Sequence, residues 1–341
     1  MAFPAETQQS FSRLSETHRS TLMAHCYRMM GSLEDAEDLV QETMIRAWQA
    51  RDSFAGRASL RTWLYKIATH ACLDALDKRK RRSLPTWVVP ASDAHTPYVP
   101  GVDEAPWLGP FPDRLLETVA PNPEAQFTER ESIRLAFMVA LHRLPPRQRA
   151  VLLLRDVLGW RAKEVAAQLD MTVAAVNSAL QRARATLQHY DTAAEEIMDS
   201  SVANDETAVP VVEHYLQAWE AADVDRLVGL LTEAATFSMP PSVIWYRGRA
   251  AIRGFLTAVT FEGHAEGRWQ MRPTQANTRP ALGLYRLDPT TGTYQAAALQ
   301  VFTVKGDQIS EVITFLSETR FTHFGLPLEI GLRKSERQAL K

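Results

Sequence analysis

Residues 34–82 constrain the fold of this chain more than any other segment, because they join two helices of very different surface chemistry. EDAEDLVQETMIRAW is rich in acids, and its apolar residues recur at helical spacing. SLRTWLYKIATHACLDAL mixes aromatic and basic residues, and KRKRR closes the segment. Gly31-Ser32 predicts a helix break followed by an N-cap. Such a helical unit can bind a basic protein surface on one side and hold nucleic acid on the other.

Composition limits the class of protein. A chain of 341 residues allows two or three domains, and a formal net charge of -2 means that local patches decide the partners. No apolar run approaches the roughly 20 residues that span a bilayer. The N-terminal MAFPAETQQSFSRL lacks a signal-peptide pattern. Cys26 and Cys72 lack metal-ligand spacing, so we expect buried, reduced thiols, no metal and a cytoplasmic location.

Changes in composition divide the chain. Trp87 and Trp107 lie in a proline-rich, acidic stretch, and large aromatic side chains there are expected to dock on a folded surface. The predicted domains are a helical unit at 8–82, a linker at 83–123, a second helical unit at 124–190, a second linker at 191–208, an α+β domain at 209–330 and a basic tail at 331–341.

Residues 144–187 predict a helix-turn-helix. A short amphipathic helix at 161–169 precedes the turn Asp170-Met171, and Thr172 can cap the next helix. The second helix would present small and amide side chains to a major groove, with arginines beside them for phosphates. Its predicted apolar face is Val173, Val176, Leu180, Ala183 and Leu187, and its polar face is Ala174, Asn177, Ser178, Gln181, Arg182 and Arg184. Arg147, Arg149 and Arg155 are expected on the DNA-proximal side of the preceding helix. An ordinary helical hairpin is the alternative.

The aromatic-basic helix predicts single-strand binding. Trp63, Ile67, Ala71 and Leu73 suit core packing, which leaves Arg61, Tyr65, Lys66, His70 and Asp74 for other faces. Aromatic side chains that stack on bases, beside cations that neutralise phosphates, are typical of single-strand binding. KRKRR is equally compatible with a solvated helix end, but its density favours phosphate contact.

With these motifs in order, the chain resembles bacterial sigma factors of the extracytoplasmic-function (ECF) group. The motif from Asp35 to Trp48 looks like sigma region 2.2, which docks on the clamp coiled coil of the RNA polymerase β′ subunit. The resemblance implies core RNA polymerase, through this coiled coil and the β flap, and promoter DNA as partners. The implied polymerase-binding residues are Asp35, Asp38, Gln41 and Glu42.

The resemblance also assigns the DNA contacts. SLRTWLYKIATHACLDAL looks like regions 2.3–2.4, which melt the −10 element, and residues 144–187 look like region 4, which reads the −35 element. His70 stands where the family usually has Asn, and Asn177 and Ala179 stand where many members have Arg or Lys. The implied −10 residues are Arg61, Tyr65, Lys66, His70, Asp74, Arg79 and Arg82, and the implied −35 residues are Ala174, Asn177, Ser178, Gln181, Arg182 and Arg184. The acidic linker resembles the segment that enters the polymerase channels.

Residues 209–330 resemble the SnoaL-like, NTF2-like α+β cone, in which helices precede a curved sheet around a pocket. The candidate pocket residues are Phe237, Met239, Trp245, Tyr285, Phe302 and Phe315. No acid and base stand at a useful spacing, so a small-ligand sensor or an intramolecular clamp is favoured over an enzyme, with no cofactor.

The fold class predicted is therefore multidomain: two all-α sigma domains followed by an α+β NTF2-like cone. The predicted function is promoter recognition and melting with core polymerase, modulated in cis by the C-terminal domain. The alternatives are a SnoaL- or ketosteroid-isomerase-like enzyme or ligand sensor fused to a helix-turn-helix, and a dimeric repressor with a ligand domain.

Overall fold

The computed structural model describes residues 17–54, 59–77, 82–87, 89–92, 107–116, 130–197, 205–262, 267–316 and 321–332. The chain forms two units, and each is described by itself. The first, called the helical unit here, is Met1–Ser83 with Leu108–Met198. The second, called the C-terminal unit, is Leu84–Trp107 with Asp199–Lys341.

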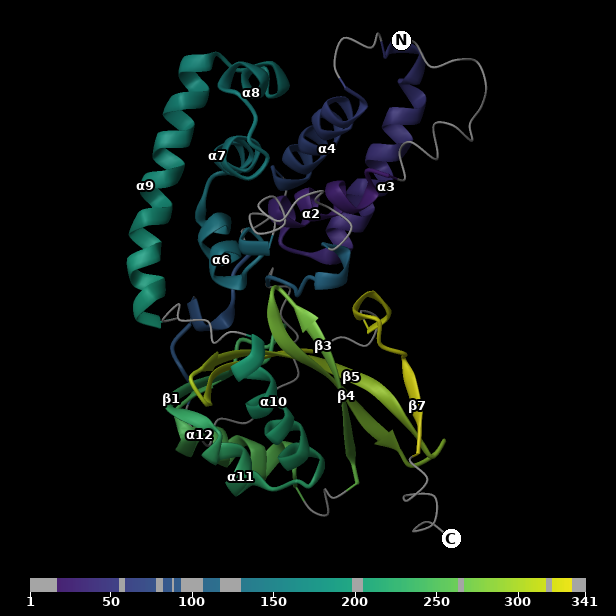
Figure 1. Ribbon diagram of the computed structural model, residues 1–341, viewed down its shortest axis with the longest axis vertical. Helices are drawn as coiled ribbons and strands as arrows, with labels where there is room; N and C mark the ends of the chain where they lie inside the picture. Colours follow the sequence, from purple (N-terminus) through teal and green to yellow (C-terminus); the bar gives the residue numbers. More distant parts are fainter. Residues whose placement is uncertain are drawn as a thin grey trace. The chain divides into compact units, whose positions relative to one another are not determined.

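The helical unit contains helices throughout its described residues (Figure 1). Its elements are α2 (Arg19–Met30), α3 (Leu33–Gln49), η1 (Arg51–Ser53), α4 (Leu60–Leu76), η3 (Asp113–Leu115), α6 (Leu135–Arg143), α7 (Pro146–Leu152), η4 (Leu153–Val157), α8 (Ala162–Gln168) and α9 (Val173–Ile197).

The predicted break between α2 and α3 is confirmed. Gly31 has φ 74°, the left-handed conformation in which a side chain is unfavourable, and it ends α2. Ser32 Oγ accepts a hydrogen bond from the Asp35 amide at 3.3 Å, so it caps α3 as expected. A Cβ at Gly31 would also lie 2.5 Å from Leu108 Cδ2, which means that only glycine lets the later segment approach here.

The helix-turn-helix is also confirmed in outline. Asp170 has φ 52° in the turn between α8 and α9, and Thr172 Oγ1 accepts from the Ala175 amide at 3.1 Å. Two details differ from the prediction. Val173 is 43% exposed rather than part of the apolar face, since it lies in the first turn of α9, and α9 runs on to Ile197 instead of ending near residue 190.

Both cysteines are buried and free, as expected. The neighbouring Cys26 side chain and burial raise the pKa of the Cys72 thiol well above its ordinary value. Because the thiolate is the reactive form, this thiol is inert at neutral pH.

The C-terminal unit is a curved sheet with helices on one face (Figure 1). The strand order is β2-β1-β6-β5-β4-β3, β7 pairs with β5, and only the β1–β6 pairing among the described strands is parallel. Its elements are η2 (Pro85–Trp87), α10 (Asp205–Glu220), α11 (Val224–Gly229), β1 (Leu231–Ser238), β2 (Trp245–Arg247), α12 (Arg249–Phe255), η5 (Leu256–Thr260), β3 (Trp269–Ala276), β4 (Arg279–Asp288), β5 (Thr293–Lys305), β6 (Gln308–Phe315), η6 (Phe321–Phe324) and β7 (Glu329–Gly331).

The core of this unit lies between the helices and the sheet. Trp219 of α10 packs edge-on against Phe261 with ring centroids 5.1 Å apart, and Tyr215 of the same helix packs against Phe302 of β5 at 4.9 Å. Glycine forms two of the strand connections, with Gly292 at φ 67° between β4 and β5 and Gly306 at φ 58° between β5 and β6. The helices-first α+β architecture is the predicted one.

Two further findings concern membrane-spanning helices and metal-binding clusters. Among the residues that the structure describes, no helix has the length and apolar character needed to cross a bilayer. Within the same residues, His, Cys, Asp and Glu side chains form no cluster that could hold a metal ion.

Candidate functional site

The outer face of α3 is the first candidate surface. Asp38 and Gln41 are exposed, and Glu42 is half-exposed and accepts a hydrogen bond from Arg46 Nη2 at 2.6 Å. Ile45, one turn further on, is 50% exposed. These positions share one helical stripe at i, i+3, i+4 and i+7. The stripe combines a carboxylate pair, an amide and an apolar contact, which is the chemistry of a protein-docking surface.

Asp35 lies on a different part of α3. Its Oδ2 accepts a hydrogen bond from Arg82 Nη2 at 2.6 Å, and the side chains of Asp35 and Arg82 are only 14% and 21% exposed. Both residues were predicted to bind partners, Asp35 to polymerase and Arg82 to DNA. In this structure each is instead engaged inside the helical unit. Arg79, another predicted DNA contact, lies outside the described residues.

This ion pair makes a stability prediction. A double-mutant cycle with Asp35→Ala and Arg82→Ala should give a coupling energy of about 1–2 kcal/mol, because the pair is largely screened from water. The exposed Glu42–Arg46 pair serves as the control and should give about 0.3–0.5 kcal/mol. Urea unfolding of the single and double variants measures both. Equal coupling in the two pairs would mean that Asp35 and Arg82 contribute no more than a surface pair.

The predicted −10 face of α4 is largely covered within the helical unit. Tyr65 is 1% exposed, its Oη donates to the Thr21 carbonyl oxygen, and its ring lies edge-on to Trp160 at 5.6 Å. Arg61 is exposed above the Tyr65 ring at 5.6 Å. Tyr65 was expected on an outer face, but its phenol packs inward because the α7–α8 segment, which carries Trp160, covers it.

The turn between α8 and α9 covers the rest of this face. Lys66 Nζ lies 3.5 Å from Asp170 Oδ1 and donates to the Ala167 carbonyl oxygen at 3.2 Å. His70 Nε2 lies 3.5 Å from Asp170 Oδ2, while its Nδ1 donates to the Lys66 carbonyl oxygen. Gln168 Nε2 donates to the Thr62 carbonyl oxygen at 2.8 Å. We call this set of contacts the α4 latch. Asp74 remains exposed near Arg46, at 3.6 Å.

The predicted −35 face of α9 is open to solvent. The exposed side chains include all those named from the sequence: Ala174, Asn177, Ser178, Gln181, Arg182 and Arg184. Arg184 makes two hydrogen bonds to Asp156, at 2.9 and 2.7 Å, which raise the pKa of its guanidinium. Arg184 is therefore positioned by Asp156, and Arg182 is the exposed cation of this face with the greater freedom to reach a phosphate.

The position of Arg149 differs most clearly from the prediction made from the sequence. It was predicted on a DNA-proximal side, but it is 1% exposed. Its guanidinium donates to the carbonyl oxygens of Leu141, His142, Leu144 and Met29. Met29 lies at the end of α2, so this side chain joins the first and second halves of the helical unit. Arg147, two residues earlier, is exposed as predicted.

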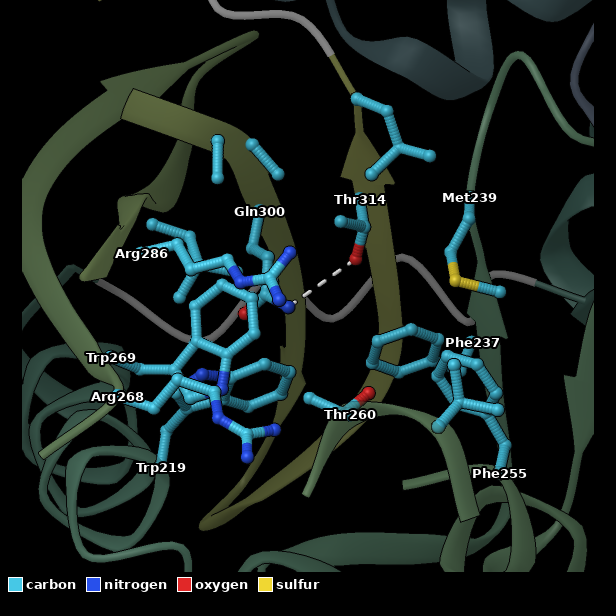
Figure 2. A pocket seen from close by; sticks show the side chains of 15 residues that line it. Trp219, Phe237, Met239, Phe255, Thr260, Arg268, Trp269, Arg286, Gln300 and Thr314 are labelled. Atoms are coloured by element: carbon cyan, nitrogen blue, oxygen red, sulfur yellow. Dashed lines mark hydrogen bonds between the residues drawn. The ribbon is translucent and has the colours of Figure 1, made fainter. Parts of the chain in front are cut away.

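The C-terminal unit contains a pocket of about 300 Å³ (Figure 2). Phe237 and Met239, two of the predicted pocket residues, line it together with Trp219, Trp269 and Phe255. Its polar lining comprises Thr260, Arg268, Arg286, Gln300 and Thr314, and Gln300 Nε2 donates to Thr314 Oγ1 at 3.3 Å. Carboxylates and histidines are missing from the described residues that line it.

Four other predicted pocket residues lie elsewhere. Phe302 is in the core against Tyr215, and Phe315 is buried outside the pocket lining. The Tyr285 hydroxyl donates to the Pro327 carbonyl oxygen, and burial raises the pKa of Tyr285 to about 12. Trp245 binds the linker. Alternation along a strand cannot separate a wall of the pocket from the rest of a two-sided core, which is why the sequence did not resolve these positions.

The linker contacts the loop around residues 240–245 of the C-terminal unit. Trp245 Nε1 donates to the Val89 carbonyl oxygen at 3.0 Å, and the Ser92 amide donates to the Trp245 carbonyl oxygen at 2.8 Å. Trp107 Nε1 donates to the Pro241 carbonyl oxygen at 2.6 Å. The expectation that Trp107 docks on a folded surface is confirmed. We call these three hydrogen bonds the linker clamp.

Comparison with known proteins identifies the domains to which these surfaces belong. Family models match three segments: Sigma-70 region 2 at residues 14–82, Sigma-70, region 4 at residues 134–187, and a SnoaL-like domain at residues 212–312. The ECF RNA polymerase sigma factor SigG of Mycobacterium tuberculosis is 44% identical over 326 residues, which cover 94% of this chain and 85% of the relative. The chain belongs to the ECF RNA polymerase sigma factor family.

A second ECF sigma factor shares the whole architecture. SigJ of Mycobacterium tuberculosis is 28% identical over 328 residues, covering 92% of this chain and 93% of SigJ. Its crystal structure matches with a TM-score of 0.56 and 26% identity over 93% of this chain and 99% of that one. The ECF sigma fold with a C-terminal SnoaL-like domain is therefore confirmed. The comparisons favour the sigma-factor function over the enzyme or sensor fused to a helix-turn-helix.

Sequence reasoning missed several residues of this ECF sigma factor. Ile45 extends the α3 stripe, and its position seven residues after Asp38 was the available signal. Asp170 and Gln168 of the α4 latch gave no signal, because their contacts join segments about a hundred residues apart. Arg268 lies just before β3 and Arg286 lies on β4, and nothing local in the sequence indicates that both side chains line the pocket.

Proposed function

We propose that this chain binds core RNA polymerase through the α3 stripe and directs promoter recognition and melting. The main support is that Asp38, Gln41 and Glu42 are accessible on one face of α3. The exposed apolar side chain of Ile45 extends this face by one turn. A basic coiled-coil surface complements these acids. Asp35 supports the stripe from behind through its pair with Arg82. Since polymerase and promoter are cytoplasmic, the protein acts in the cytoplasm.

Promoter binding follows from α4 and α9 in this proposal. The exposed amides and Arg182 of α9 read the −35 element and its backbone. Arg61, Tyr65, Lys66, His70, Asp74 and Arg79 serve the −10 element, whereas Arg82 stays paired with Asp35. The α4 latch must open first, because Tyr65, Lys66 and His70 are engaged by Trp160 and Asp170. The latch is thus a closed form in which the −35 face is available and the −10 face is not.

The C-terminal unit modulates activity in cis by holding the linker. The linker is acidic and resembles the segment that enters the polymerase channels, and the linker clamp fixes residues 89–92 and 107 at the loop around Trp245. A linker held here is withheld from polymerase, so the clamp is inhibitory. The described lining residues include no carboxylate and no histidine, which supports a binding role over acid–base catalysis.

Replacing the two indoles tests the linker clamp. Trp107→Phe with Trp245→Phe keeps an aromatic ring at each position but removes both indole N–H donors. Each lost hydrogen bond costs about 0.5–1.5 kcal/mol, so release of the linker should rise by about tenfold. Hydrogen exchange of the Ser92 amide should become faster, and run-off transcription with core polymerase should increase. Tyr285→Phe is the control, because it also removes a side-chain donor to a carbonyl oxygen in the same unit but touches neither the linker clamp nor the pocket lining.

The two readouts separate two kinds of failure. Unchanged Ser92 exchange in the double variant would show that the clamp does not hold the linker in solution. Faster exchange with equal or lower transcription would show that the linker is released but that its release does not activate.

A further inference from the structure

We propose that the pocket of the C-terminal unit is a binding site for a small aromatic molecule with an anionic head group, such as an aryl carboxylate. This inference rests on the proposed function, in which the unit regulates in cis, and it names the ligand class. Three observations carry it: the aromatic walls, the cationic rim and the apolar mouth.

The walls favour an aromatic body. Trp219 and Phe237 are each 2% exposed, and Trp269 and Phe255 complete the lining from β3 and α12. A volume of about 300 Å³ is at the lower end of the range for small-molecule sites, which fits one or two fused rings rather than a long chain. Aromatic rings in such a wall bind a ring edge-on or offset-stacked, and Met239 adds a polarizable contact.

The rim favours a negative charge. Arg268 and Arg286 both line the pocket, and Figure 2 shows their guanidinium groups on the same side as Trp219 and Trp269, across from Phe237 and Phe255. Arg286 is exposed and lies over the Trp269 ring at 5.9 Å. Arg268 is fixed by a hydrogen bond from Nη2 to the Glu262 carbonyl oxygen at 3.0 Å. With two arginines and no carboxylate among the described lining residues, the lining itself carries a net positive charge, and Arg pairs well with a carboxylate.

The mouth is apolar. Val259 and Leu316 line the pocket and are 41% and 37% exposed, respectively. Large exposed side chains at the opening of a concave site are typical of ligand access. An aromatic body can therefore pass these two side chains while its charged group stays at the arginines.

The pocket is connected to the linker clamp through its own wall. Met239 lines the pocket and is followed by Pro240 and Pro241. The Leu316 amide donates to the Pro240 carbonyl oxygen at 3.1 Å, and the Pro241 carbonyl oxygen accepts from Trp107. A ligand that contacts Met239 and Leu316 would therefore contact the residue that precedes Pro240-Pro241 and the residue that donates to it, and this segment accepts the hydrogen bond from Trp107.

Binding of matched probes to the full-length protein tests the site without polymerase. Indole-3-acetate, indole-3-ethanol and tryptamine share a ring system and differ in charge. Isothermal titration should show that the carboxylate binds at least about tenfold more tightly than the alcohol, with tryptamine weakest, because a charge-assisted hydrogen bond is about twice as strong as a neutral one. Equal binding of the three probes, or no binding of the carboxylate, would overturn the proposal.

Two variants assign the binding to this pocket. Arg286→Gln should weaken indole-3-acetate binding about tenfold and leave indole-3-ethanol nearly unchanged, since it removes the charge but keeps a polar side chain with N–H donors. Arg226→Gln is the control, because Arg226 is exposed on α11 away from the pocket and bonds Gln217. Ala297→Trp should block all probes by filling the cavity, with circular dichroism to verify folding. Unchanged carboxylate binding in Arg286→Gln would overturn the site, whatever the result of the transcription assay.

Discussion

Charge reversal at Asp38 and Glu42 should abolish binding of this ECF sigma factor to core RNA polymerase. Asp38→Lys with Glu42→Lys places two cations on the stripe that we expect to face a basic coiled coil. Like charges at an interface cost several kcal/mol, so affinity should fall by at least about 100-fold. Asp38 is exposed and the Glu42 side chain is 46% exposed, so the double variant should fold normally, which circular dichroism can verify. Fluorescence anisotropy of labelled protein against core enzyme measures the affinity.

The control variant makes one charge reversal of the same kind at a position off the stripe. Asp52→Lys reverses a carboxylate whose side chain is 87% exposed just after α3. It should bind core enzyme with nearly normal affinity. Normal affinity of the Asp38 and Glu42 variant for core enzyme would show that the α3 stripe does not dock on polymerase. An equal loss of affinity in the Asp52 variant would lead to the same conclusion.

Arg149→Met should destabilise the helical unit by at least about 3 kcal/mol. The substitution keeps most of the side-chain volume but removes the donors to carbonyl oxygens on α6, the α6–α7 connection and the end of α2. Buried acceptors left without a donor cost about 1–3 kcal/mol each, although some will relax toward water. Thermal or urea unfolding measures the loss.

The neighbouring residues give this second prediction its control. Arg147→Met changes an exposed arginine on the same helix and should alter stability by less than about 0.5 kcal/mol. Burial, with Arg149 beside it, also lowers the pKa of His142 well below its ordinary value. His142 is therefore neutral, and its Nε2 donates to the Arg28 carbonyl oxygen at 3.2 Å. Equal stability of the Arg149 and Arg147 variants would show that the buried guanidinium does not join the two halves.

The helices and the domain types could be predicted from the sequence because their signals are local. Ser32 and Thr172 cap their helices by hydrogen bonds to amides three residues on, and such signals depend only on neighbouring residues. The exposed face of α9 was likewise predictable from helical spacing. Val173 was an exception, since a residue in the first turn of a helix can lie beyond the packed interface.

The positions of the other residues depend on contacts between segments that lie far apart in the sequence. In the sequence Arg149 resembles a surface arginine. Only the fold shows that it donates to the carbonyl oxygen of Met29, which is far away in the chain. Tyr65 follows the pattern of a stacking platform, yet Trp160 covers it. In the C-terminal unit several strands carry no clear alternation, because β2 and β7 are three residues long and β4 is continuously buried from Ala281 to Tyr285. Pocket residues on such strands cannot be separated from core residues by alternation.

Transcription with purified core polymerase tests the central claim most directly. Core enzyme with the full-length protein should produce discrete run-off transcripts from a library of genomic promoter fragments. Those transcripts should be absent with core enzyme alone and with the Asp38→Lys, Glu42→Lys variant, and present with Asp52→Lys. No protein-dependent transcript from any fragment, or transcripts that persist when the α3 stripe is reversed, would contradict the account.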